Sequence, residues 1–312
     1  MTQNPRFIHL RTHTEYSLLE GAVRLKKLPD LCKKYEMPAI AVTDSNNLFA
    51  ALEFSVSASG AGVQPIMGCQ VDLRFTDPAP GERPKPPAPL VLLAQSETGY
   101  EHLMKLNSCL YMREGSELAH VTLEELAQYA GDVICLSGGP DGPVGRLLQM
   151  GQRSAAEALM QRLKAIFPDR LYVELQRHPG EHGQPEAEQL TERGHIEMAY
   201  AMDLPLVATN DVYFPNTEMY EAHDAMICIA EGAYVDQVEP RRRLTASTTS
   251  KARKKWSRCL PICQRRWKTP WRSPNAAPLW RIGAIRSCRS LPMTRWPNCA
   301  ASPMRACSSD WQ

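Results

Sequence analysis

The sequence predicts an α/β protein whose strands are parallel and close into a distorted (β/α)7 barrel. Short apolar runs typical of buried strands alternate with helical apolar patterns from residue 7 to about residue 229. The strand count is near seven, and ionisable residues follow several strand ends, where barrels of this kind build their sites. A doubly wound open sheet is the alternative architecture.

The first elements follow from local pattern. A β-branched and apolar run predicts the first strand at residues 7–12, and Leu25, Leu28 and Leu31 form one helical stripe. The expected order is strand 7–12, helix 25–36, strand 39–42, a helix through Phe49, Leu52 and Val56 that Gly60 and Gly62 close, and strand 65–75.

A loop then separates this part from the rest. Residues 78–89 contain six prolines and predict an extended, solvated loop. Thr122 and Glu125 stand at capping-box spacing, which predicts the start of a short helix. The later elements are expected as strand 90–94, helix 99–112, the short helix, strand 132–136, helix 145–167, strand 171–175, helix 186–202, strand 206–209 and helix 219–229.

Composition excludes some classes of protein. The 312 residues are 43% hydrophobic and 22% charged, as in globular proteins, and no apolar run predicts a membrane span or a signal peptide. The ten cysteines form no CxxC pair, which favours reduced thiols in the cytoplasm over a disulfide framework.

The net charge of +2 conceals two different compositions. Residues 247–312 contain 14 of the 36 Lys and Arg but only one of the 34 Asp and Glu, so this segment carries +13 and residues 1–246 carry −11. The same segment holds all six tryptophans and five of the ten cysteines. We therefore expect a folded domain at residues 1–246 and a separate basic tail at residues 247–312.

The first strand carries the strongest functional signal. Strand alternation places His9, Arg11 and His13 on one face, and the carboxylates Glu15 and Glu20 follow. Imidazoles at this spacing beside carboxylates suit a divalent metal, whereas the common alternative is a hydrogen-bonded core histidine.

The residues after this strand resemble the opening motif of the polymerase and histidinol phosphatase (PHP) domain. The likeness continues in family order to about residue 246, and it is nearest to the PHP domain at the N-terminus of bacterial DNA polymerase III alpha subunits. The matching stretches are residues 16–21, 41–44, 62–68, 92–94, 136–138, 172–175, 208–212 and 221–224.

The resemblance implies a PHP-type distorted (β/α)7 barrel and a nine-ligand site for up to three metal ions. In metal-binding members these ions polarise a phosphate ester and generate hydroxide. His9 and Asp211 match the ligand pattern, and Glu20 replaces an aspartate. Six ligand positions hold other residues, namely Arg11, Ser45, Gln70, Pro89, Gly139 and Tyr213.

These replacements predict a degenerate, metal-free site. Arginine does not deprotonate in proteins and brings positive charge where cations would bind. His9, Glu20 and Asp211 are vestigial positions that can hold at most one weak ion. We expect Arg11 to pair with Asp44, Glu20 or Asp211 instead, with no cofactor and no catalytic residue in this chain.

Other candidate ligands have simpler interpretations. Pro179-Gly180 places His178 and His182 in a loop, so these two and His195 are expected to be solvated. The cysteines Cys32, Cys69, Cys109, Cys135 and Cys228 lie in apolar patterns and are expected to be small buried hydrophobes. His223 matches an alpha-subunit motif and is expected to pack.

The basic tail resembles text read in the wrong frame. If one base is missing after the codon of Ala246, the shifted frame can encode an acidic, helix-patterned peptide similar to the alpha-subunit continuation. The single-codon residues Trp256, Trp267 and Trp271 all fit that frame. We therefore expect residues 247–312 to be frameshifted and unfolded.

The family resemblance implies a role in DNA replication. Intact alpha subunits are DNA-directed DNA polymerases (nucleotidyltransferases) that use Mg²⁺, and their PHP domain docks the proofreading exonuclease subunit within the polymerase III holoenzyme. This truncated chain lacks the polymerase palm and the regions that bind DNA, so we expect it to be inactive alone. The alternatives are an active metal-dependent PHP phosphoesterase or 3′–5′ exonuclease, and a basic-tailed nucleic-acid-binding protein.

Overall fold

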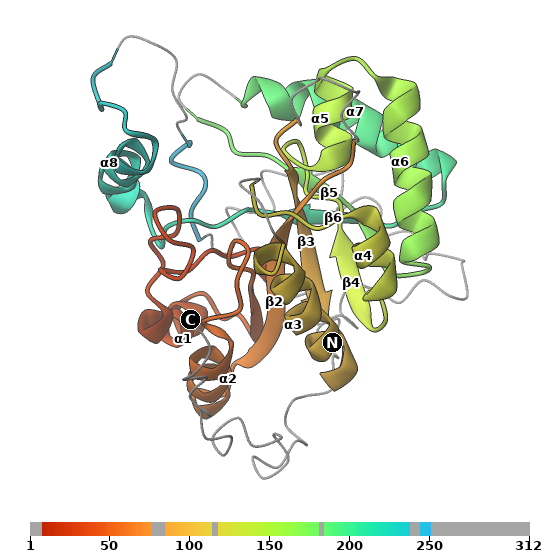
Figure 1. Ribbon diagram of the computed structural model, residues 1–312. Helices are drawn as coiled ribbons and strands as arrows, with labels where there is room; N and C mark the ends of the chain where they lie inside the picture. Colours follow the sequence, from red (N-terminus) through yellow and green to blue (C-terminus); the bar gives the residue numbers. More distant parts are fainter. Residues whose placement is uncertain (1–7, 77–84, 114–117, 181–183, 238–243, 251–312) are drawn as a thin grey trace, which may run out of the picture.

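The computed structural model describes residues 8–76, 85–113, 118–180, 184–237 and 244–250 as one curled α/β fold (Figure 1). Six strands lie in sheet order β1-β2-β3-β4-β5-β6, so each strand neighbours the next one along the chain. The strands are β1 Ala39–Val42, β2 Gln64–Leu73, β3 Ala88–Ala94, β4 Val133–Leu136, β5 Leu171–Gln176 and β6 Leu206–Thr209.

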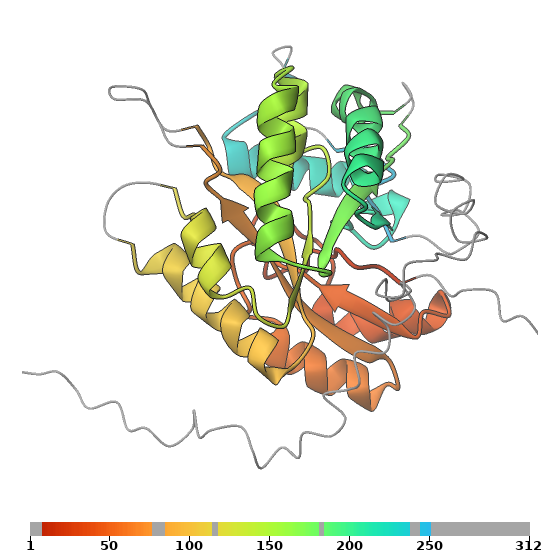
Figure 2. The same cartoon turned by 90° about the vertical axis from the view of Figure 1, so that its right-hand side faces the viewer.

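Helices cover the outside of the curl. Figure 1 shows α1 and α2 near one edge of the sheet and α5, α6 and α7 near the other, and Figure 2 shows the same layers from the side. The helices are α1 Leu28–Lys34, α2 Ala51–Gly60, α3 Glu97–Tyr111, α4 Leu123–Gln128, α5 Pro143–Gln149, α6 Arg153–Ile166, α7 Glu186–Ala201 and α8 Tyr220–Glu231, with 3-10 turns at Leu25–Lys27 and Thr217–Met219.

One strand runs against the expected direction. β3 pairs antiparallel with both β2 and β4, whereas the remaining strand pairs are parallel. The connection between β2 and β3, of which the structure describes residues 74–76 and 85–87, has no described helix, and antiparallel neighbours do not need a helical crossover. The loop expected over residues 78–89 ends too late, because Ala88 and Pro89 belong to β3. The expectation of a fully parallel sheet is therefore wrong at β3.

The expected first strand is a bridge between the two sheet edges. His9 O accepts a hydrogen bond from Ala41 N–H on the β1 side (2.9 Å), and His13 N–H donates to Val212 O beyond β6 (2.8 Å). Thr12 and Val212 form an isolated parallel bridge. This segment therefore occupies the place of the seventh strand and joins β1 to the chain that leaves β6.

Alternation along the strands builds two cores. On the inner face, Val91 and Leu93 of β3 pack with Leu136 of β4 and Leu10. On the outer face, Leu90 and Leu92 belong to the largest core, beneath α3 to α7. A third core lies between β1, α1 and α2.

Two local predictions have opposite outcomes. The capping box at Thr122 and Glu125 is confirmed at the start of α4. The single helix expected over residues 145–167 is wrong, because α5 ends at Gln149 and α6 begins at Arg153. Gly151, at φ +69°, turns the chain between them in the left-handed region that favours glycine.

Two further observations bear on the expected domain boundary. Ser247–Ser250 are described and lie against the chain beyond β6, with Thr248, Thr249 and Ser250 buried. Residues 251–312 lie outside the described part, so the prediction for most of the tail stays a prediction.

In the described part, no helix combines the length and apolar character needed to cross a membrane.

Candidate functional site

The predicted site residues gather where the carboxyl ends of the parallel strands meet the bridging segment. Asp44 follows β1, Gly139 follows β4, and Asp211 follows β6. Because β3 is reversed, its first residues reach the same end: a side chain on Gly138 would lie 2.2 Å from Pro89 O. The reversal therefore brings Pro89, the second residue of β3, to the site.

Arg11 is the centre of the site and is only 2% exposed. Its Nε lies 2.9 Å from Asp211 Oδ1, and its Nη1 lies 3.3 Å from Glu174 Oε1. Nη2 donates to Gln70 Oε1 (2.7 Å), and Nη1 donates to Gly138 O (3.4 Å). One guanidinium thus ties together four segments that are far apart in the sequence.

The charges around Arg11 shift each other's pKa. Burial by itself disfavours both charged groups, but Asp211 and Glu174 raise the pKa of Arg11 above its ordinary value. Burial also opposes ionisation of Asp211, yet Arg11 and His13 outweigh it and lower the pKa of Asp211 to about 2. Arg11 therefore stays cationic and Asp211 anionic at neutral pH.

Asp211 is also connected to the exposed rim through His13. His13 Nε2 lies 3.0 Å from Asp211 Oδ1, and His13 Nδ1 lies 3.4 Å from Ser45 Oγ. Ser45 Oγ–H donates to Glu20 Oε2 (2.6 Å), and Tyr213 stacks on the His13 ring with centroids 4.3 Å apart. Ser45 and Tyr213, two of the positions where the resemblance implies a metal ligand in other members, are thus part of a hydrogen-bonded and stacked network.

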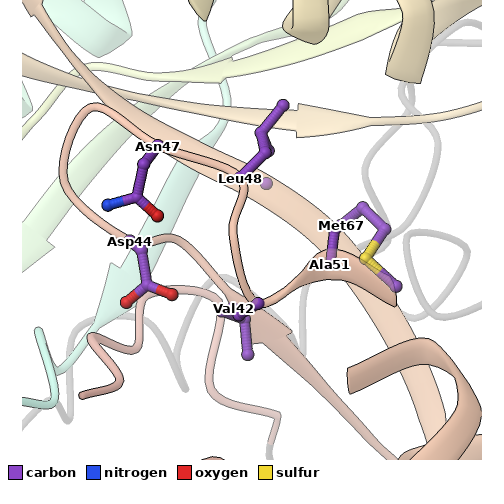
Figure 3. Close-up of a pocket in the computed structure, with 8 residues that line it drawn as sticks. Val42, Asp44, Asn47, Leu48, Ala51 and Met67 are labelled. Carbon is purple, nitrogen blue, oxygen red and sulfur yellow. The ribbon is translucent and has the colours of Figure 1, made fainter. Parts of the chain in front are cut away.

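Asp44 belongs to the same region but has different partners. Its Oδ1 accepts from Thr14 N–H (2.6 Å) and Ser17 Oγ–H (2.6 Å), and its Oδ2 accepts from Thr14 Oγ1–H (2.7 Å). Of the three partners considered for Arg11, which were Asp44, Glu20 and Asp211, the structure pairs it with Asp211, and Glu174 is a second partner in place of Asp44. Figure 3 shows Asp44 and Asn47 beside a cavity of about 10 Å³, room for a single water at most.

The three vestigial positions are distributed over this network. Asp211 pairs with Arg11, Glu20 accepts from Ser45, and His9 Nε2 lies 3.4 Å from Ser250 Oγ. Among the described residues, no group of three or more His, Cys, Asp or Glu side chains has an arrangement that could hold a metal ion. The guanidinium of Arg11 lies among the carboxylates where such an ion would need to bind.

Gln70 and Gly139 also lie in the network around Arg11. Gln70 accepts from Arg11, and its Nε2 donates to Ser45 Oγ (3.4 Å). Gly139 has φ +63°, and a side chain there would come within 3.0 Å of Gln176. Gln176 in turn donates to Glu174 (2.9 Å), so a larger residue at Gly139 would disturb the carboxylate that Arg11 holds.

Two histidines that were expected to be solvated are buried. His178 is 4% exposed, with Nδ1 2.5 Å from Glu188 Oε1 and Nε2 2.9 Å from Asn210 O. His195 is 1% exposed on α7, and burial lowers its pKa to about 4. That expectation is wrong for both, and His182 lies outside the described residues. Proline-glycine indicated a loop, but a loop can fold inward when its polar groups find partners.

The other single-residue expectations are mostly confirmed. Four of the five cysteines are buried, and Cys109, which is only half-buried, is the exception. His223 is buried, donates from Nε2 to Glu20 O (2.6 Å), and packs against Phe214 with ring centroids 4.9 Å apart. Its predicted packing role is therefore confirmed.

Sequence reasoning missed Glu174 as a site residue. It lies within β5, whose six residues are all buried, and its Oε1 accepts from Thr209 Oγ1 as well as facing Arg11. A charged residue inside an otherwise apolar strand was the available signal, since a buried carboxylate requires a partner.

Known proteins with similar sequences match most of the described chain. A family model described as PHP domain matches residues 9–178. The DNA polymerase III subunit alpha of Caulobacter vibrioides is 44% identical over 241 residues, which cover 77% of this chain and 20% of that protein. The subunit of the same name from Rickettsia prowazekii is 38% identical over 229 residues, covering 73% and 18%.

A comparison of folds adds a distant likeness. An amidohydrolase from Chromobacterium violaceum is 13% identical and has a TM-score of 0.43, over 70% of this chain and 96% of that one. Among the curated relatives, the chain spans about a fifth of the length of those it matches.

Proposed function

Because this chain belongs to the PHP domain family, we propose that it is the PHP part of a DNA polymerase III alpha subunit and works as a scaffold in the cytoplasm. The observation that carries the proposal is the 44% identity over 241 residues to an alpha subunit. As this similarity covers a fifth of the relative, we propose that DNA polymerisation with Mg²⁺ belongs to the remaining length.

Two experiments test this assignment. Resequencing the gene across codons 240–260 and onward is expected to restore one base after codon 246 and to open a long reading frame. Purified chain of 312 residues is expected to give no template-dependent nucleotide incorporation. Incorporation by the purified chain would contradict the assignment of polymerisation to the missing length.

We further propose that the site around Arg11 is metal-free and that the guanidinium replaces the cations of metal-binding relatives in holding the carboxylates together. The support is the placement of Arg11 between Glu174 and Asp211. A cation within a few ångströms of this guanidinium would meet strong repulsion. The protein is first incubated with Mn²⁺ or Zn²⁺ and then dialysed against metal-free buffer. It is expected to retain less than stoichiometric metal and to melt at the same temperature with and without EDTA. Stoichiometric retained metal would overturn this part.

The third part of the proposal is docking of the proofreading exonuclease subunit. Its support is an exposed apolar face, which we define as Leu18, Leu19, Phe49, Leu52 and Val56. Phe49, Leu52 and Val56 are 64%, 66% and 49% exposed and follow i, i+3, i+7 spacing along α2 and the residues before it. Exposed apolar faces of this kind mark protein–protein contacts.

The two parts of the apolar face are joined by hydrogen bonds. Tyr16 Oη donates to Glu53 Oε2 of α2 (3.2 Å), and Asn47 Nδ2 donates to Tyr16 O (2.9 Å). These contacts hold the turn that carries Leu18 and Leu19 against the start of α2. The face therefore presents two elements to one partner.

A pull-down with purified exonuclease subunit tests the docking surface. Phe49→Asp with Leu52→Asp is expected to weaken capture at least tenfold, because both charges would be buried in the contact. Leu190→Asp is the matched control, since Leu190 is 59% exposed on α7, outside the apolar face. Equal capture by the double variant, or equal loss in the control, would reject this surface.

A further inference from the structure

The segment Ser247–Ser250 lies along the chain that leaves β6. Thr249 forms a parallel bridge with Phe214. Tyr213 N–H donates to Thr248 O (3.2 Å), and Ser250 N–H donates to Phe214 O (3.3 Å). The segment therefore pairs with residues 213–214 through an isolated parallel bridge and two main-chain hydrogen bonds.

Asn210 secures the same segment from the side. Its Nδ2 donates to Thr249 O (2.5 Å) and lies 3.4 Å from Ser247 O. Each of these contacts, like the two main-chain bonds, uses the main chain of Ser247–Ser250 rather than its side chains. Hydrogen bonds of this kind are available to any residue type, apart from the missing N–H of proline.

The side chains of the segment make fewer contacts with residues 210–214 than its main chain does. Ser247 Oγ–H donates to Pro179 O (2.5 Å), Thr248 Oγ1–H donates to Thr245 O (2.5 Å), and Ser250 Oγ lies 3.4 Å from His9 Nε2. Within the described part of the chain, the buried Thr249 Oγ1 has no hydrogen-bond partner, although a buried hydroxyl normally has one. The three hydroxyl contacts therefore go to residues outside 210–214, whereas the main chain pairs with residues 210–214 themselves.

We propose that the edge formed by residues 210–214 is a docking edge for an extended peptide segment, recognised through its main chain and occupied here by Ser247–Ser250. Recognition of the main chain lets the edge accept different side chains, which explains how the segment is held although the composition of the chain changes at residue 247. Pairing of an extended segment with a free main-chain edge is a general mode of peptide recognition. By holding the residues that follow Ala246, the edge sets where the chain leaves the domain and places Ser250 beside His9.

Hydrogen exchange on the full chain tests the proposal, with the Tyr213 amide as the readout. Ser250→Pro removes the N–H that bonds to Phe214 O and is expected to speed Tyr213 exchange about five- to tenfold. Ser250→Ala is the matched control, because it removes the hydroxyl near His9 but keeps the N–H. Amides of β3 report whether the whole domain has been destabilised.

A second variant changes the side chains together. This variant combines Ser247→Ala, Thr248→Val, Thr249→Val and Ser250→Ala. Its Tyr213 amide is expected to exchange at a rate within about twofold of that in the parent chain. If this variant loses as much protection as Ser250→Pro, side chains rather than the main chain hold the segment, and the proposal is wrong. Unchanged Tyr213 exchange in Ser250→Pro would overturn it as well.

Discussion

Asp211 and Asp44 lie in the same site but are stabilised by different chemistry. Asp211 faces a guanidinium and an imidazole, Arg11 and His13, whereas Asp44 accepts three hydrogen bonds from Thr14 and Ser17 without an ion pair among them. Asp44 is 1% exposed and Asp211 is 6% exposed. The comparison teaches that one site can hold buried carboxylates either with a fixed positive side chain or with local hydrogen-bond donors.

The stabilisation of Asp211 and that of Asp44 are expected to be lost in different ways. The Arg11 half depends on one side chain that connects distant segments, so removing it strands two buried charges at once. The Asp44 half depends on neighbours within one turn of the bridging segment, and each supplies only part of the stabilisation. The following predictions test this difference, from the largest expected effect to the smallest.

Arg11→Met is expected to have the largest effect. It leaves Glu174 and Asp211 buried without the guanidinium, and breaking a buried pair in this way costs about 3–5 kcal/mol. Urea unfolding measures the loss. Arg153→Met is the control, because Arg153 is 53% exposed in its pairs with Glu157 and Glu197, so solvent screens these pairs and the variant is expected to lose far less stability than Arg11→Met. If both variants lose the same free energy of unfolding, the buried pairs of Arg11 are no more important for stability than an exposed pair.

His195 must be separated from the site before any acid effect is interpreted. Its pKa is lowered by burial to about 4, so the unfolded chain binds its proton first as the pH falls. Its contribution is complete above about pH 6.5 and is lost progressively toward pH 4, by about 3 kcal/mol. In His195→Leu, the free energy of unfolding is expected to change less with pH between pH 6.5 and pH 4. An unchanged slope in this variant would show that another group titrates there.

Asp211 controls a lower acid window. Because its folded pKa of about 2 lies below the unfolded value near 4, its stabilisation is present above pH 4 and falls as the pH drops toward 2. The amount is about 2–3 kcal/mol. In Arg11→Met the pKa of Asp211 is expected to rise, which moves the window to higher pH. NMR titration of the Asp211 carboxyl carbon measures this directly, and an unmoved midpoint would contradict the role given to Arg11.

Asp44→Asn is expected to have the smallest effect of the four. The amide keeps one acceptor but turns an NH2 toward hydroxyl donors, so about 1–2 kcal/mol is lost through unmade hydrogen bonds. Thermal unfolding compared with Arg11→Met gives the ranking. If Asp44→Asn loses more stability than Arg11→Met, the hydrogen bonds to Asp44 are more important than the ion pairs of Arg11, and the comparison is reversed.

Local patterns predicted local structure well. β6 was expected at residues 206–209 and is observed as Leu206–Thr209, and the capping box at Thr122 is present. The predicted helix over residues 145–167 missed the break at Gly151, because both flanking stretches share helical apolar spacing. Periodicity alone does not register a single left-handed residue.

The candidate site was predictable as a set of positions rather than as a set of contacts. The resemblance identified Arg11 and Asp211, and their ion pair was among three that were considered. Glu174 was not chosen, although it faces the same guanidinium from β5. The expected solvation of His178 and His195 was wrong because burial of a single residue depends on elements that pack over it from elsewhere in the chain.

The sequence by itself determined the alternation of strands and helices, the family and the change of composition at residue 247. These follow from residue types and short-range spacing. Only the tertiary structure decided the reversal of β3, the partners of Arg11 and the pairing of Ser247–Ser250 with residues 213–214. The physical reason is that a buried charge or an unpaired main-chain group takes whichever partner the packed chain brings within hydrogen-bonding distance.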